Sequence, residues 1–241
     1  MRYSIGLTFV FVSLAMLVIS CGGGNSSSNV GDDVGGKVVK IKPPKSPLLS
    51  AIDQDKADLV KQHMDAGTDP NEYKPAMGFV VVHLQQWGAE GTYPLQLAVL
   101  KNSQEIVKLL LDNGANIDIK TKEVATRGGT SNEVGFTSLH WAAYFCMKDM
   151  VSFLIQSGAS INELDANGST PLDVLVLGEE RGTNIRDAQL EDPSKYSHGA
   201  DQLTPGCVGK VEIDDTVKAQ LLEDLLGVFD ANGGQYSKDL G

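Results

Sequence analysis

The feature that most constrains the fold is a phrase that the chain repeats. Residues 106–118 read IVKLLLDNGANID, and 44 positions later residues 150–162 read MVSFLIQSGASIN with the same spacing of apolar residues and glycine. A fainter copy, LVKQHMDAGTDPN, occupies residues 59–71. A short recurring unit of this kind cannot bury its apolar face alone. The period therefore predicts an array of stacked units that share one core.

A second phrase precedes each copy of the first. It reads SPLLSA at residues 46–51, YPLQLA at 93–98, TSLHWA at 137–142 and TPLDVL at 170–175. Together the two phrases resemble the ankyrin repeat, in which a Thr-Pro-Leu-His turn opens one helix and an Ile-Val-x-Leu-Leu-Leu helix ends in Gly-Ala and Asn. The resemblance implies an all-α solenoid of helix-turn-helix units with hairpin loops. It places about four repeats, near residues 46–72, 92–119, 136–163 and 169–177.

The spacing between units is uneven. The interval from Pro47 to Pro94 is 47 residues and the next is 44, whereas the interval from Ser138 to Pro171 is 33, the usual ankyrin period. The extra residues follow the Gly-Ala-Asn phrase, where ankyrin repeats project their hairpin loops. The resemblance therefore puts both insertions on one face, which we call the loop face.

The two insertions lie within residues 72–91 and 119–134. Insertions between repeats commonly mark a binding face, so we expect the loop face to contact a partner protein. The candidate contact residues are Phe79, Val81, His83, Trp87 and Arg127. The alternative is that the apolar segment GFVVVHLQQWG folds down and covers the weakly matching first repeat. The sequence leaves both readings open.

The fourth repeat is interrupted. Residues 178–214 are polar and hold two prolines, and a helix is predicted only beyond them, over residues 216–229 (TVKAQLLEDLLGVF). This distant helix is a candidate for the second helix of the fourth repeat, where it would serve as a cap with a polar outer face. Alternatively, it packs elsewhere.

The N-terminal residues resemble an export signal. Arg2 precedes an apolar run of 15 residues, too short to span a bilayer and typical of a signal peptide. The run ends in Val18-Ile19-Ser20-Cys21, which resembles a bacterial lipobox. This implies that residues 1–20 are removed and that Cys21 carries fatty acids such as palmitate. A plain secretory signal or an uncleaved anchor is the alternative.

The residues after Cys21 are predicted to be a spacer. Residues 21–45 are rich in Gly, Ser, Asn and Pro, a composition that cannot bury a core. We therefore expect a flexible tether, followed by an ankyrin-repeat domain over residues 46–241. A lipid-anchored protein of the bacterial cell envelope, facing the periplasm, is the expected localisation.

The composition limits the classes of partner. The formal net charge of −11 argues against nucleic acid, whose phosphates require a basic surface. Excess acid favours a basic protein partner, although it also serves solubility alone. The four histidines, His63, His83, His140 and His198, lack metal-ligand spacing, and no Cys-x-x-Cys occurs. No metal, cofactor or small-molecule substrate is expected.

Two cysteines and one histidine are the remaining candidates for special roles. In an exported protein Cys146 and Cys207 are a possible disulfide. Cys146 aligns with Asp55 and Asn102 at the turn between two helices. His140 lies in the best-matching phrase, and the ankyrin resemblance implies that it ties adjacent repeats together. Its counterparts in the other repeats vary, which argues against a repeated ligand site: Leu49, Gln96 and Asp173.

We therefore expect a protein–protein interaction module and no enzyme. One more specific alternative is a periplasmic immunity protein that neutralises a secreted toxin. Another is an enzyme with its site in residues 178–214. That alternative requires titratable groups to converge in one cleft, and the candidates are Glu179, Asp192, His198 and Cys207.

Overall fold

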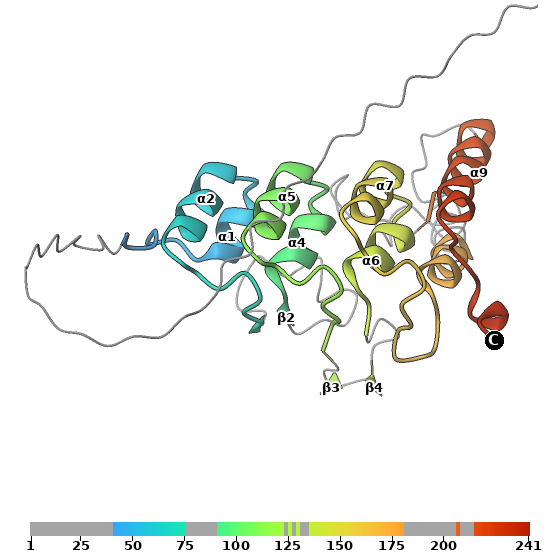
Figure 1. Ribbon diagram of the computed structural model, residues 1–241, viewed down its shortest axis with the longest axis horizontal. Coiled ribbons are helices and arrows are strands. Elements are labelled where there is room, and N and C mark those ends of the chain that lie inside the picture. Colours follow the sequence, from blue (N-terminus) through green and yellow to red (C-terminus); the bar gives the residue numbers. More distant parts are fainter. Residues whose placement is uncertain are drawn as a thin grey trace, which may run out of the picture. The chain divides into compact units, whose positions relative to one another are not determined.

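Helix pairs stack side by side in the computed structural model (Figure 1). The structure describes residues 41–75, 91–122, 125–126, 129–130, 135–180, 206–207 and 215–241. All of them belong to one compact unit, Lys40–Gly241. The expected all-α solenoid of helix-turn-helix units is confirmed. None of the helices in this described part is long and apolar enough to cross a membrane.

The helices form two rows. The inner row, beside the hairpins, contains α1 (Leu48–Asp53), α4 (Pro94–Leu100) and α6 (Ser138–Tyr144). The outer row contains α2 (Ala57–Asp65), α5 (Gln104–Asp112), α7 (Lys148–Gln156) and α9 (Asp215–Ala231). Residues 171–180 form a further helix, and a short 3-10 helix, η3 (Ser237–Asp239), lies near the C-terminus.

The turn inside each helix pair follows from the sequence spacing. Asp55, Asn102 and Cys146, which the alignment matched, have φ angles of 52°, 55° and 51°. They are the non-glycine residues with positive φ among those that the structure describes. Asn and Asp tolerate this left-handed conformation, whereas cysteine does so less readily. The same turn therefore recurs in each of these three units. In the third unit it holds a cysteine in an unfavourable backbone conformation.

The core lies between the two rows of helices. Each outer helix buries one face, as α5 does with Ile106, Val107 and Leu110. By contrast, every residue of α4 and of α6 is buried. Burying one such aliphatic side chain contributes about 1.5–3 kcal/mol. Helices α4 and α6 are thus covered on the side away from the outer row as well, whereas Ser50 and Asp53 of α1 are partly exposed.

The described ends of both insertions lie on the side of the inner row, opposite the outer helices (Figure 1). Strands β1 (Lys74–Pro75) and β2 (Gly91–Thr92) pair antiparallel and close the base of the first insertion. Strands β3 (Ala125–Thr126) and β4 (Gly129–Thr130) pair antiparallel within the second. The two hairpins therefore lie on a common face.

Helix α9 continues the outer row. It packs against α7, as α5 packs against α2. The side-chain amide of Asn162 donates to the Gly233 carbonyl at 2.9 Å, and its oxygen accepts from the Gln235 backbone N–H at 2.7 Å. Asn71 makes the same two bonds to Gly114 and Asn116 two repeats earlier. Helix α9 accordingly takes the place of a second helix in the fourth repeat.

A disulfide fastens the interruption of the fourth repeat to the third repeat. Cys146 and Cys207 are bonded, with their Cα atoms 5.0 Å apart. Beside the bridge, the Gly206 backbone N–H donates to the Tyr144 carbonyl at 2.7 Å. A Cβ on Gly178 would lie only 2.4 Å from that carbonyl oxygen. Glycine is therefore required where these backbones meet.

Candidate protein-binding face

The predicted contact residues Phe79, Val81, His83, Trp87 and Arg127 lie outside the described residues, as does the predicted lipidation site Cys21. The question of whether residues 76–90 bind a partner or cover the first repeat also falls outside them. The described part of the loop face consists of the hairpin bases and the loops between repeats.

Two tyrosines and a lysine meet where the bases of the two insertions adjoin. Tyr73 directly precedes β1, and Tyr93 directly follows β2. Their ring centroids are 5.2 Å apart in an edge-to-face arrangement. The Lys122 ammonium, from the start of the second insertion, lies 4.6 Å from the Tyr73 centroid and 5.9 Å from that of Tyr93. We call these three side chains the hairpin-base cluster.

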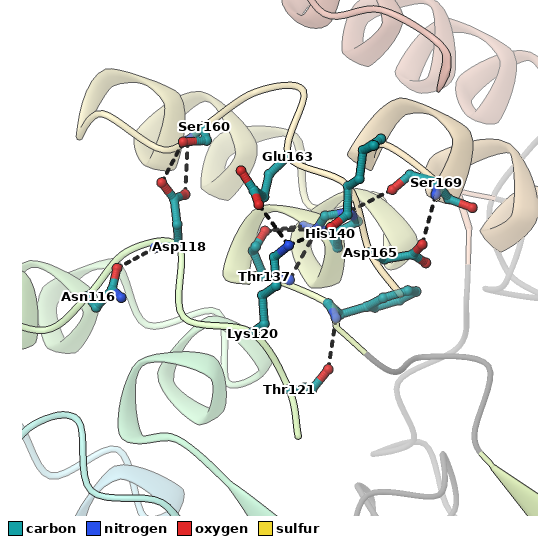
Figure 2. Close-up of polar contacts among 12 residues, drawn as sticks. Asn116, Asp118, Lys120, Thr121, Thr137, His140, Ser160, Glu163, Asp165 and Ser169 are labelled. Atoms are coloured by element: carbon teal, nitrogen blue, oxygen red, sulfur yellow. Dashed lines mark hydrogen bonds and ion pairs between the residues drawn. The ribbon is translucent and has the colours of Figure 1, made fainter. Parts of the chain in front are cut away.

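Polar contacts join the loop after α5, at residues 118–120, to the loop after α7, at residues 160–164 (Figure 2). The Asp118 carboxylate accepts from the Ser160 backbone N–H at 2.9 Å and from its hydroxyl at 2.6 Å. The Lys120 ammonium pairs with Glu163 at 2.7 Å and also donates to the Leu164 carbonyl at 2.8 Å. Exposed ion pairs contribute little to stability, so their main effect is to fix the relative position of the loops.

His140 is a structural tie between repeats (Figure 2). Its Nδ1 accepts from the Thr137 backbone N–H at 3.1 Å, which completes a capping box at the start of α6. Since Nδ1 accepts, Nε2 carries the proton and donates to the Ser169 carbonyl at 3.1 Å. Burial lowers the pKa of His140 below its usual value of 6.5, although the bond to Ser169 opposes this. The imidazole is therefore held neutral.

Two of the three counterparts of His140 make the same kind of tie with different chemistry, whereas Leu49 in the first repeat is apolar. Gln96 donates through Nε2 to the carbonyls of Phe136 at 3.0 Å and Ile119 at 2.9 Å. Asp173 instead accepts, from the Ser237 backbone N–H at 2.9 Å and from Thr170. Burial raises the pKa of Asp173, but these hydrogen bonds outweigh it and hold the pKa below 3.8. In these three repeats the side chain at this position ties one repeat to the next.

The His140 tie predicts a pH dependence of stability. Because the folded-state pKa is lowered, His140 stabilises the fold fully above its unfolded pKa of 6.5, and this stability is lost as the pH falls below that value. We expect His140→Ala to lower the free energy of unfolding at pH 8 by about 1–3 kcal/mol and to remove this pH dependence. The measurement is urea unfolding at several pH values between 8 and 5.

The chain supplies a matched control for this prediction. His140→Gln introduces the amide that Gln96 uses at the same position, so it keeps a donor for the Ser169 carbonyl without a titrating group. We expect it to retain more stability than His140→Ala at pH 8. If His140→Gln lost stability below pH 6.5 as the wild type does, His140 would not be the titrating group.

A hollow of about 530 Å³ borders the first hairpin. Its walls come from residues 43–50 and Pro94, and Glu72 and Lys74 line it on the hairpin side. His63, which fills the core position of Leu110 and Leu154 in the other repeats, is buried beside it. Its Nε2 lies 2.8 Å from the Ser46 carbonyl, and its Nδ1 lies 3.2 Å from the Thr68 hydroxyl. The polar core residue is thereby satisfied.

One group of three potential metal ligands occurs within the described residues, namely Cys146, Glu179 and Cys207. The two sulfurs are bonded to each other and so supply no thiolate. The Glu179 carboxylate accepts from the Cys207 backbone N–H. His198 and Asp192, which the enzyme alternative also requires, lie outside the described residues. Within the described residues, Cys146 and Cys207 therefore form a structural disulfide.

The hairpin-base cluster was not predicted from the sequence. Tyr73 and Tyr93 flank the first insertion, so their positions were available as a signal. Lys122 belongs to another repeat, and only the stacking of repeats brings it to the tyrosines. The aromatic packing inside the inner row was also missed, with ring centroids 5.0 Å apart for Phe136 and Trp141 and 6.0 Å apart for Trp141 and Phe145.

Comparison with known families gives a match over the stacked helix pairs. Residues 48–165 match the family model of ankyrin repeats, which contains three copies. This range begins at the first residue of α1 and ends beyond α7. The helix over residues 171–180, the disulfide partner Cys207 and α9 lie outside the match.

Several curated proteins are similar to the chain. A putative ankyrin repeat protein of Fowlpox virus (strain NVSL) is 29% identical over 146 residues, which cover 52% of this chain and 71% of the viral protein. Alpha-latrocrustotoxin-Lt1a of Latrodectus tredecimguttatus is 33% identical over 62% of the chain, and human SH3 and multiple ankyrin repeat domains protein 2 is 30% identical over 53%. The chain spans only 9% and 6% of these two proteins.

Proposed function

Because the chain belongs to the ankyrin repeat family, an interaction fold, we propose that it is a membrane-tethered module that binds a partner protein through its loop face. The observation that carries this proposal is the placement of the two insertions. Both leave the array on one side, and their bases are joined there by the hairpin-base cluster. Per-repeat insertions on one face are the usual place for dedicated recognition.

The burial of the inner row supports the loop face as the contact surface. Every residue of α4 and α6 is buried, so these helices offer no exposed side chain to a partner. The described surface that remains on this side comprises the hairpin bases, the inter-repeat loops and α1, which lines the hollow beside the first hairpin. The net charge of −11 favours a partner with a basic surface, which it would attract most strongly at low salt.

The tether is proposed from the N-terminal sequence. The lipobox-like ending at Cys21 and the spacer over residues 21–45 are typical of a lipoprotein whose domain is held off a membrane. We propose a place in the bacterial cell envelope, facing the periplasm. Cys21→Ser is expected to abolish incorporation of labelled palmitate and to release the protein from the membrane fraction. An unlabelled wild type would refute the lipid anchor.

The binding proposal is tested by crosslinking in cells followed by purification of the full-length chain. The variant replaces residues 79–87 with a Gly/Ser loop of equal length. A matched control exchanges the charges of the exposed Lys61–Asp65 pair on α2, in the outer row. We expect one stoichiometric partner to be captured by the wild type and the control, and to be lost from the loop variant.

The identity of the partner then separates two versions of the function. A toxin delivered into the periplasm would make the chain an immunity protein, whereas an envelope enzyme would make it an adaptor. If the loop variant, shown to be folded by circular dichroism, captured the same partner as the wild type, residues 79–87 would not be the binding site and recognition would lie elsewhere.

A further inference from the structure

Each insertion is closed at its base by backbone pairing. At the first insertion Lys74 pairs with Thr92 across β1 and β2. At the second, the Thr121 backbone N–H donates to the Phe136 carbonyl at 2.8 Å, and the Gly135 N–H donates to the Thr121 carbonyl at 3.2 Å. Each base is therefore a defined structural unit with a fixed exit point.

Lys122 reaches from the second base to the first. It directly follows Thr121, and its ammonium lies over the Tyr73 ring at 4.6 Å. Lys120, two residues earlier, instead pairs with Glu163 of the third repeat at 2.7 Å. Among the ion pairs of the described residues none uses Lys122. Its charge is thus directed at the tyrosine rings.

A cation over an aromatic ring contributes about 0.5–1 kcal/mol at an exposed site. The edge-to-face pair of Tyr73 and Tyr93 adds about 0.5–1.5 kcal/mol and holds both ends of the first insertion together. These energies are small compared with the free energy of unfolding of a domain. The local opening of a hairpin base, however, has a free energy of about the same size. The cluster is therefore strong enough to couple the two bases.

We propose that the bases of the two insertions behave as one unit, coupled through the hairpin-base cluster, with Lys122 as the positioning residue. The coupling would hold the described ends of both insertions in one arrangement on the loop face, so its use in recognition rests on the proposed binding function. The coupling itself is a property of the free chain, so it is tested without a partner, and its failure is distinguishable from failure to bind.

The test is hydrogen exchange of backbone amides, measured by NMR on the free full-length protein. Lys122→Met removes the charge and keeps the length of the side chain. We expect it to speed exchange about two- to fivefold at Thr92, which corresponds to the loss of one exposed cation–π contact. Reciprocity requires that Tyr73→Leu speed exchange in the second hairpin, at residues 125–130. Lys122→Arg keeps the cation and is expected to restore wild-type exchange at both places.

Lys120→Met is the matched control, because Lys120 is the adjacent lysine but contacts the third repeat. We expect it to leave the exchange of Thr92 unchanged. The proposal is overturned if Lys122→Met affects only the second hairpin and Tyr73→Leu only the first, since the two insertions would then be independent. It is also overturned if Lys120→Met affects Thr92 as strongly as Lys122→Met does.

Discussion

Removing the disulfide with Cys146→Asn/Cys207→Ser is expected to lower the free energy of unfolding by about 4 kcal/mol under oxidising conditions. The bridge closes a loop of 61 residues, and a cross-link over a loop of this length strongly restricts the unfolded chain. It also fastens the Gly206 turn to the carbonyl of Tyr144. The measurement is guanidinium unfolding, with and without a thiol reductant, followed by circular dichroism.

The choice of asparagine at position 146 separates two effects on stability, namely the loss of the disulfide and the strain at the left-handed turn. Cys146 has a φ of 51°, and Asn102 holds the same left-handed conformation one repeat earlier. The single variant Cys207→Ser leaves a strained cysteine at this turn, so we expect it to be less stable than the double variant by about 1 kcal/mol. A wild-type transition that does not move when reductant is added would contradict the predicted contribution of the bridge.

Phe229→Ala is expected to lower the free energy of unfolding by about 3–5 kcal/mol. Phe229 is fully buried on α9. On the same helix, the Asp224 carboxylate accepts a hydrogen bond at 2.7 Å from the Lys148 ammonium of α7. If α9 is an integral second helix of the fourth repeat, emptying its buried position leaves a cavity in the shared core. Denaturant unfolding followed by circular dichroism measures the effect.

Val217→Ala on the same helix is the control, because Val217 is 57% exposed. Surface substitutions usually change stability by less than about 0.5 kcal/mol, and we expect that here. If Phe229→Ala changed stability no more than Val217→Ala, α9 would be an appendage that contributes nothing to the core. Asn162→Ala gives a second check, since it removes both hydrogen bonds to the end of α9.

The repeated phrases predicted much of the fold. Gly67, Gly114 and Gly158 follow the outer helices with φ of 76°, 87° and 93°, as the helix-ending role of glycine requires. The alignment of Cys146 with Asp55 and Asn102 likewise identified the left-handed turn. These features are local, because each depends on residues a few positions apart. A period in the sequence therefore predicts them without reference to other repeats.

The candidate site was predicted less completely. The sequence placed both insertions on one face, because the repeat period fixes where extra residues must leave the array. It did not identify Lys122, whose contact with Tyr73 spans two repeats. It also left open whether Cys146 and Cys207 meet, since a bond across 61 residues depends on the path of the intervening chain.

The sequence by itself determined the architecture of the first three repeats, because each of them encodes its own helix pair, turn and helix end. The tertiary structure alone decided three things: that α9 completes the fourth repeat, that the disulfide joins that repeat to the third, and that the hairpin bases meet at Lys122. These depend on stacking, which brings together residues from different units. The spacing within one unit carries no information about such contacts, whereas it specifies the unit itself.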